Sequence, residues 1–368
     1  MATTGRTVVA KIGTSSLTSP SGSIRVAAIE KLCAEVAELC AGGNRVVIVT
    51  SGAIAAGLPV LGFGDSRPSD PAVLQAVSAV GQAELLGHYN RALAAHDLIG
   101  GQVLLAPLDF VNRRQYLHAR QTLTVLLDLG VVPVVNENDA VADDEIRFGD
   151  NDRLAALVAH LLAADLLVLL TDTPGVLSGD PRLSQDASLI EEIVAVDHDL
   201  EVVAGGAGSP HGSGGMASKL AAAKIAAWSG VRAVIAAADR PDVLVDAAAG
   251  RPGVGTVVVP RRQRLPARKL WIAFAVGSSG TVIVDAGARA ALLARGVSLL
   301  PAGVIDVRGS FDAGDAVEIA GPDGAVFAKG LCRYPASLLQ RLAGSQTAAL
   351  PPDTSHEVVH RDDMVLLP

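Results

Sequence analysis

Short apolar runs alternate with longer segments of helical periodicity from residue 7 to residue 237. Runs rich in Val, Ile and Leu predict buried strands at 7–12, 46–50, 102–105, 131–135, 166–171 and 232–237. Apolar residues at helical spacing predict helices between them, at 24–41, 72–95, 113–129, 151–163 and 217–229. Because strands and helices alternate, we predict an α/β fold, a three-layer sandwich with a mostly parallel central sheet.

The pattern changes after residue 260. The tract 261–269, RRQRLPARK, holds five basic residues and no acidic one. Beyond it, β-rich runs such as TVIVD and AVEIA are separated by Gly, Pro and Asp, which predicts a small β-barrel-like domain with one or two helices. We expect a first domain at 1–260, a linker at 261–277, a second domain at 278–358 and a C-terminal tail at 359–368. The alternative for the basic tract is a nucleic-acid tether.

Composition narrows the class of protein. The chain has 368 residues, of which 50% are hydrophobic and 18% charged, as is typical of a folded protein of about two domains. Its formal net charge of -8 disfavours a protein whose whole surface binds nucleic acid. The three cysteines form no CxxC pair, and no apolar stretch predicts a signal peptide or a membrane span. We therefore expect a cytoplasmic protein with no membrane partner.

Polar residues follow four of the predicted strands at their carboxyl ends. These clusters are 11–16, 50–52, 136–139 and 171–172. Ligands of parallel α/β sheets bind beyond the carboxyl ends of the strands. The four clusters together therefore predict an active-site edge.

A glycine-rich tract, 205–219, precedes an alanine-rich helix and ends in Lys219. The chain has neither GxxxxGK[ST] nor a GxGxxG after a strand, so the P-loop and Rossmann nucleotide sites are not supported. Glycines let the backbone approach an anion, and a helix N-terminus attracts phosphate. Lys11, in an apolar run at a strand end, needs an anionic partner. Two such lysines suit phosphoryl transfer. The alternatives are a flexible loop with a solvated Lys219, and a Lys11 whose side chain snorkels to the edge of the sheet.

Asp150 and Asn151 stand at the start of the helix predicted at 151–163. Asp150 is a candidate for holding the two lysines in place, and Asn151 for donating a hydrogen bond to a substrate carboxylate. The alternative is ordinary capping of the helix, which does not exclude catalysis.

Seven segments occur in an order that resembles the glutamate 5-kinase family of the amino-acid kinase superfamily. They are VAKIGTSSLT (9–18), VTSGAIAAG (49–57), PVVNENDAV (133–141), FGDND (148–152), LLTDTPGV (169–176), DPR (180–182) and GSGGMASK (212–219). The resemblance extends over nearly the whole chain and includes a C-terminal segment similar to a PUA domain. It implies the amino-acid kinase fold and transfer of the ATP γ-phosphoryl group to the side-chain carboxylate of L-glutamate, the first step of proline biosynthesis.

The resemblance also implies roles for residues. Lys11 and Lys219 would neutralise the phosphoryl group in flight, and Asp150 would organise them. Glutamate would be bound by Ser51, Gly52, Asp139 and Asn151, with Asp139 at the α-ammonium. The nucleotide would be bound by Lys11, Gly13, Thr171, Asp172, Ser213, Gly214, Gly215, Met216, Ala217, Ser218 and Lys219. Mg²⁺ is expected to bridge the ATP phosphates with few protein ligands, and we predict no metal-binding side chain.

Two departures from the family pattern affect these expectations. Leu177 stands where the family usually has tyrosine, which puts the adenine contacts in question. Pro210 and His211 occur in a loop that usually has smaller residues, and we interpret His211 as loop surface.

Other functions remain as alternatives. A sister kinase of the superfamily, such as aspartate kinase, would share the fold, and a PUA-like tail could bind RNA. Residues 278–356 hold six basic and seven acidic side chains, so we do not expect an RNA partner there. The resemblance further implies proline as a feedback inhibitor and a homo-oligomer, a dimer or a tetramer.

Overall fold

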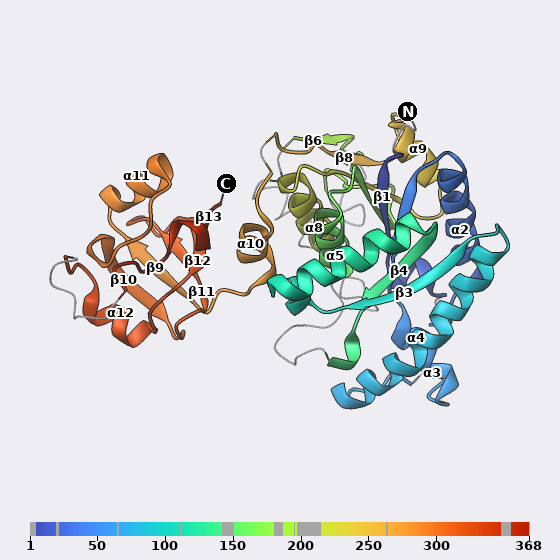
Figure 1. Cartoon of the computed structure of the whole chain (residues 1–368), viewed down its shortest axis with the longest axis horizontal. Coiled ribbons are helices and arrows are strands. Elements are labelled where there is room, and N and C mark those ends of the chain that lie inside the picture. The colour runs from blue at the N-terminus through green and yellow to red at the C-terminus, as the bar shows by residue number, and fades with distance from the viewer. Residues whose placement is uncertain are drawn as a thin grey trace. The chain divides into compact units, whose positions relative to one another are not determined.

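The chain is divided into two compact units, Met1–Arg264 and Leu265–Pro368, and each has a hydrophobic core of its own (Figure 1). The computed structural model describes residues 5–19, 22–64, 66–110, 112–141, 151–179, 187–194, 196, 215–262, 264–346 and 355–367. The division between the units lies inside the tract expected to be a linker. No helix within these described ranges is long and apolar enough to cross a membrane.

The first unit is built on a mainly parallel sheet with the strand order β3-β4-β2-β1-β5-β7-β8-β6. Its strands are β1 (Thr7–Ile12), β2 (Arg45–Val49), β3 (Ile99–Leu105), β4 (Val131–Glu137), β5 (Leu166–Thr171), β6 (Glu192–Ile193), β7 (Arg232–Ala237) and β8 (Thr256–Val258). Neighbouring strands pair in parallel except β7 and β8, which are antiparallel. The carboxyl ends of the six strands from β3 to β7 therefore meet at one edge.

Helices cover both faces of this sheet. They are α1 (Thr14–Leu17), α2 (Val26–Ala41), α3 (Ala53–Val60), α4 (Pro71–Ala94), α5 (Arg113–Asp128), α6 (Asn151–Leu161), α8 (Met216–Trp228) and α9 (Val243–Ala249), with short 3₁₀ turns η1 (Pro107–Phe110) and η2 (Asp139–Val141). Side chains of α2, α4 and α9 share one core cluster with the sheet, whereas α6 and α8 pack on each other and on β1, β5 and β7. The expected three-layer α/β sandwich is confirmed.

The elements expected from the apolar pattern are all present with ends that differ by at most a few residues. The pattern did not predict α3, α9, β6 or β8. The segment AIAAGLPV of α3 contains Pro59 and has no polar face, and β6 is two residues long, so neither offers a periodic signal.

Helices α3 and α4 cross closely because glycine stands at the contact on both. A Cβ atom on Gly81 of α4 would lie 1.7 Å from the Ala53 carbonyl oxygen, and one on Gly57 of α3 would lie 2.1 Å from the Val77 carbonyl oxygen. Only glycine lets two backbones approach this far. The crossing fixes the loop that precedes α3 against the middle of α4.

The second unit contains a five-stranded sheet in the order β10-β9-β11-β12-β13. The strands are β9 (Gly280–Val284), β10 (Val304–Gly309), β11 (Ala316–Ala320), β12 (Val326–Leu331) and β13 (Met364–Leu366), and the helical segments are α10 (Ala267–Leu270), η3 (Trp271–Ala275), α11 (Ala286–Arg295), η4 (Pro301–Gly303), α12 (Ala336–Leu342) and η6 (Arg361–Asp363). Two features differ from expectation. Residues 267–275 are helical, with Leu270 and Ile272 fully buried, and the expected tail supplies β13 to the sheet.

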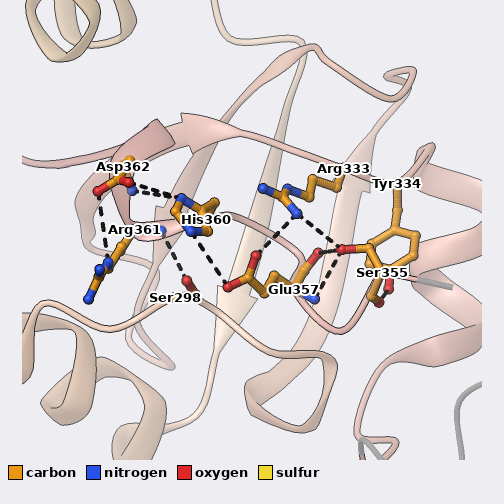
Figure 2. Close-up of polar contacts among 8 residues, drawn as sticks. All are labelled: Ser298, Arg333, Tyr334, Ser355, Glu357, His360, Arg361 and Asp362. Atoms are coloured by element: carbon orange, nitrogen blue, oxygen red, sulfur yellow. Dashed lines mark hydrogen bonds and ion pairs between the residues drawn. The ribbon is translucent and has the colours of Figure 1, made fainter.

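A polar network fastens the segment that leads into β13 (Figure 2). Arg333 forms an ion pair with Glu357 at 3.1 Å, and the Tyr334 hydroxyl donates to the Ser355 carbonyl oxygen. His360 lies between Glu357 and Asp362 and accepts a hydrogen bond from the Asp362 N–H (Figure 2). These contacts are local to the second unit, and we assign them a structural role.

Candidate active site

Lys11 is a charged residue on a strand that is buried along its whole length. The alternation of β1 directs Val8, Ala10 and Ile12 into the core shared with α2 and α4, so Lys11 points to the opposite face, which α6 covers. Its side chain is only 5% exposed, and its Nζ lies 2.6 Å from Asp152 Oδ1. A buried ammonium is costly without such an anionic partner.

Asp152, in the first turn of α6, joins Lys11 to Lys219. Its Oδ2 accepts a hydrogen bond from the Ser218 hydroxyl at 2.8 Å and lies 3.4 Å from Lys219 Nζ. Burial favours the neutral carboxyl, but Lys11, Lys219 and the Ser218 hydroxyl together hold the pKa of Asp152 below its ordinary value. The carboxylate is therefore ionised between two buried cations, and the three side chains carry one net positive charge.

Lys219 belongs to the first turns of α8. Burial lowers the pKa of Lys219, Asp152 opposes that change, and the neighbouring Lys11 adds to it. Gly215 is the N-cap of α8 and makes no side-chain capping hydrogen bond. The N–H groups and the positive dipole end of α8 thus lie beside the lysines, an arrangement that favours a phosphate group.

Ser51 and Asn151 form a second buried contact next to this cluster. The Asn151 amide donates to the Ser51 hydroxyl at 3.0 Å, while Asn151 Oδ1 is buried without a hydrogen-bond partner in the described part of the chain. Gly52 follows at φ +99°, a left-handed conformation that suits glycine, and α3 begins at the next residue. Since Asn151 precedes Asp152, one helical turn holds both contacts.

Asp139 lies at the same edge of the sheet, after β4, in a different set of contacts. The Ser78 hydroxyl of α4 donates to Asp139 Oδ2 at 2.5 Å. Burial raises the pKa of Asp139, and the Ser78 hydrogen bond acts against that rise. Nearby, the Gln82 side chain donates to the Glu137 carbonyl oxygen and accepts from the Asn136 amide.

A pocket of about 240 Å³ opens beside Asp139. It is lined by Ser78, Ala79, Gln82, Ala83, Gln102, Leu104, Asn138, Asp139 and Ala140. A carboxyl group and uncharged amides in a small pocket suit a compact cation or zwitterion.

Thr171 and Asp172 complete the edge at the end of β5. The Thr171 hydroxyl donates to Asp172 Oδ1 at 3.0 Å. The charge of Asp172 acts to raise the pKa of Lys219, so this pair lies within electrostatic range of the lysine cluster.

The structure thus brings Lys11, Ser218 and Lys219 together and pairs Ser51 with Asn151. Asp150, Ser213, Gly214, Pro210 and His211 lie outside the described residues, so their predicted roles stay predictions. Sequence reasoning missed Asp152, which holds both lysines, and Ser78, which holds Asp139. A signal for Asp152 was present: Ala155, Ala156 and Ala159 repeat at helical spacing from it and mark the buried face of α6. Ser78 stands in a long helix with nothing in its neighbourhood to single it out.

Two family models match the chain. The amino acid kinase family matches residues 6–237, and the PUA domain matches residues 280–350. The chain therefore belongs to the amino acid kinase family, and its second unit contains a PUA domain.

Curated relatives narrow this class. The chain is 44% identical over 364 residues to glutamate 5-kinase of Geobacter sp. (strain M21) and 45% identical over 364 residues to glutamate 5-kinase of Burkholderia ambifaria. Each alignment covers 98% of this chain and 97% of the relative. The resemblance to the glutamate 5-kinases is thereby confirmed over both units.

Solved structures agree on the fold. Carbamate kinase from Giardia lamblia bound to AMP-PNP superposes with a TM-score of 0.51 and 17% identity, covering 70% of this chain and 99% of that one. At this identity the likeness concerns the amino-acid kinase fold alone.

Proposed function

We propose that the chain transfers the γ-phosphoryl group of ATP to the side-chain carboxylate of L-glutamate, giving L-glutamyl 5-phosphate, the first step of proline biosynthesis. The observation that carries the proposal is the buried cluster of Lys11, Asp152 and Lys219 at the carboxyl edge of the sheet. Relatives of the same length that are named glutamate 5-kinase support the choice of substrate.

The lysine cluster supplies the charge that phosphoryl transfer needs. In the transition state negative charge spreads over the oxygens of the transferred group, and fixed cations in a dry site stabilise it. Asp152 holds both ammonium groups in place, and the cluster keeps one net positive charge. The glutamate carboxylate is already ionised at pH 7, so its oxygen attacks in line without a general base.

The nucleotide fits the N-terminal end of α8. The N–H groups that follow Gly215 and the ammonium of Lys219 would bind the phosphates. Thr171 and Asp172 would contact the nucleotide from the end of β5, together with Gly13, Met216, Ala217 and Ser218. Gly13 stands beside Lys11, since a Cβ atom there would lie 3.2 Å from Lys11 Nζ.

We propose that ATP would enter as its Mg²⁺ complex, in which the metal would reduce the negative charge of the phosphates. Among the described residues no three His, Cys, Asp or Glu side chains converge, and Asp152 is engaged by both lysines. We therefore derive no catalytic step from a protein-held metal. The residues of this chain supply the cationic surroundings of the phosphoryl group.

Glutamate would lie between the Asp139 pocket and the lysines. Asp139 would bind the α-ammonium, which offsets the burial of its carboxylate. Ser51, Gly52 and Asn151 would bind the rest of the amino acid, and the unpartnered Asn151 Oδ1 offers an acceptor for a substrate N–H. Because Asn151 adjoins Asp152, this placement directs the side-chain carboxylate to the lysines.

Proline shares the ammonium and the α-carboxylate of glutamate. We therefore propose that it inhibits at or near the same site and raises the apparent KM for glutamate. An absence of any effect at millimolar proline would reject this part of the proposal. We also propose a homo-oligomer, dimer or tetramer, formed through the kinase domain, which sedimentation of the full chain would test.

The direct test of substrate class measures ADP release with glutamate, aspartate and N-acetylglutamate in separate reactions. Hydroxylamine traps acyl phosphates as hydroxamates, which identifies the product independently of ATP turnover. We expect hydroxamate formation with glutamate alone. Turnover of aspartate without turnover of glutamate would assign the chain to another branch of the family.

A further inference from the structure

The basic tract that begins at residue 261 has no part in the proposed reaction, and its first residues lie on the first unit. The guanidinium of Arg261 stands 4.1 Å from the centroid of the Trp228 ring, and the Arg261 N–H donates to the Ala227 carbonyl oxygen at 2.8 Å. This segment is therefore attached to the C-terminal end of α8. It is not a free linker at this point.

Arg264 lies against the same end of α8. A Cβ atom on Gly230 would be 2.6 Å from both Cγ and Nε of Arg264. The arginine side chain therefore packs directly against the glycine backbone. Both arginines remain exposed to solvent. Contact with α8 thus holds two guanidinium groups in place while leaving them accessible.

Arg120 of helix α5 adds to this concentration of positive charge. Burial, together with the charges of Arg264 and Arg120, lowers the pKa of His160 to about 4. Arg120 of α5 and Arg264 therefore both lie within electrostatic range of the last turn of α6. Arg262, which lies between Arg261 and Arg264 in the chain, is exposed as well.

Within the described ranges, none of the exposed arginines 120, 261, 262 and 264 forms an ion pair with a carboxylate. Nor does α8 need them as caps, because backbone N–H groups of Ser229, Gly230 and Val231 already bond its last carbonyl oxygens. Like charges gathered without a partner are unfavourable, and a bound polyanion would relieve them.

We propose that this basic patch, defined by Arg120, Arg261, Arg262 and Arg264, binds the phosphate backbone of single-stranded RNA. Guanidinium groups bind phosphate in a bidentate manner, and all four cations of the patch are arginines. Four exposed positive charges on two segments exceed what one phosphate ester requires, which favours a polymer of phosphates. The patch joins the first residues of the basic tract, for which the sequence left a nucleic-acid tether as an alternative, to Arg120 of the kinase unit, and it does not include the C-terminal domain.

The basic patch is separate from the active site. Asp152 and Lys219 stand at the N-terminal ends of α6 and α8, whereas His160 and Trp228 stand at their C-terminal ends. The two sites therefore lie at opposite edges of the sheet. Charge changes in the patch should leave phosphoryl transfer intact.

The test compares two variants of the full chain that lose the same charge. Arg120→Gln/Arg264→Gln removes two cations of the patch, and Arg25→Gln/Arg67→Gln removes two exposed arginines that form no ion pair within the described residues. Binding of a labelled 20-nucleotide single-stranded RNA is followed by fluorescence anisotropy at several salt concentrations. Glutamate-dependent ADP release is measured in parallel as a control for folding.

We expect the patch variant to bind RNA at least about tenfold more weakly. The slope of log Kd against the logarithm of the salt concentration should fall by roughly one for each phosphate that the variant no longer binds. The control variant should bind as the wild type does, and both should keep their kinase activity. If RNA binding weakened equally in the two variants, the effect would depend on net charge alone, and this result would overturn the proposal. So would absence of RNA binding by the wild type, or binding of inorganic polyphosphate without RNA.

Discussion

Asp152 is the residue on which the arrangement of the two buried lysines depends. Its Oδ1 forms an ion pair with Lys11, and its Oδ2 accepts hydrogen bonds from Lys219 and Ser218. The sequence points to Asp150 of the motif GDND as the organising carboxylate, a prediction that falls outside the described residues. Motif spacing indicates which loop carries a charge, whereas the choice between two acids two residues apart depends on the rotation of α6.

Replacement of Asp152 by Asn should affect both folding and catalysis. The change leaves two buried ammonium groups without an anion, and breaking a buried pair in this way costs about 3 kcal/mol of unfolding free energy or more. We expect kcat to fall by about a hundredfold or more, because the lysines lose their fixed positions.

Urea unfolding and steady-state kinetics of Asp152→Asn and Asp150→Asn measure this directly. Asp150→Asn is the matched control, since it removes the neighbouring acid of the same motif. Normal stability and normal kcat in Asp152→Asn, with lower stability and lower kcat in Asp150→Asn, would show that Asp150 organises the lysines.

Asp139 gives a pH dependence whose direction can be stated. Burial raises the pKa of Asp139, so this carboxylate is protonated at higher pH than an ordinary one as the solution is acidified. If it binds the α-ammonium, kcat/KM for glutamate falls along that acid limb. Loss of the Ser78 hydrogen bond raises the pKa of Asp139 further.

Ser78→Ala should therefore move the acid limb of kcat/KM to higher pH, and Ser78→Thr, which keeps a hydroxyl, should restore it. The profile is measured with glutamate below its KM. An acid limb at the same pH in the wild type and both variants would show that the protonation of Asp139 does not control glutamate binding.

At the scale of elements, the crossing of α3 and α4 connects the fold to the site. The loop Ser51-Gly52 leads into α3, and α4 carries Ser78 and Gln82, which contact Asp139 and the end of β4. The close approach at Gly57 and Gly81 sets the distance between these groups. A side chain added at either glycine must push the two helices apart, which moves one side of the proposed glutamate site.

Gly81→Ala should destabilise the chain by about 2 kcal/mol and raise the KM for glutamate, since its Cβ atom would lie 1.7 Å from the Ala53 carbonyl oxygen. Gly87→Ala on the same helix is the control. There the nearest atom is Arg91 Nη1 at 3.7 Å, so the better helix propensity of alanine should stabilise the protein by up to about 1 kcal/mol. Equal effects of the two changes would mean that the crossing has no special role.

The strands also show which elements can be predicted from the sequence. Strands β5 and β7 were predicted to the residue because their apolar runs are continuous and lie in the middle of a covered sheet. Strand β13 was not, because MVL at the end of a polar segment owes its strand conformation to pairing with β12. The contact of Ser78 with Asp139 joins residues 61 positions apart, which no local pattern encodes.

At the scale of the whole molecule, the described residues of the proposed active site all lie in the first unit. That unit has its own core, formed by the sheet with α2, α4 and α9. We expect a chain that ends at Arg264 to fold and to retain glutamate-dependent ATP turnover. Circular dichroism confirms folding, and ADP release measures the activity; a folded but inactive fragment would show that the PUA domain takes part in catalysis.

The central claim is that two buried lysines act on the phosphoryl group in the transition state. The measurement that tests it most directly is kcat and glutamate KM for Lys219→Ala, with Lys224→Ala on the same helix as the control. We predict a fall of about a hundredfold or more in kcat with little change in KM, because the lost interaction is made mainly in the transition state. An unchanged kcat in Lys219→Ala, or equal losses in both variants, would contradict the account.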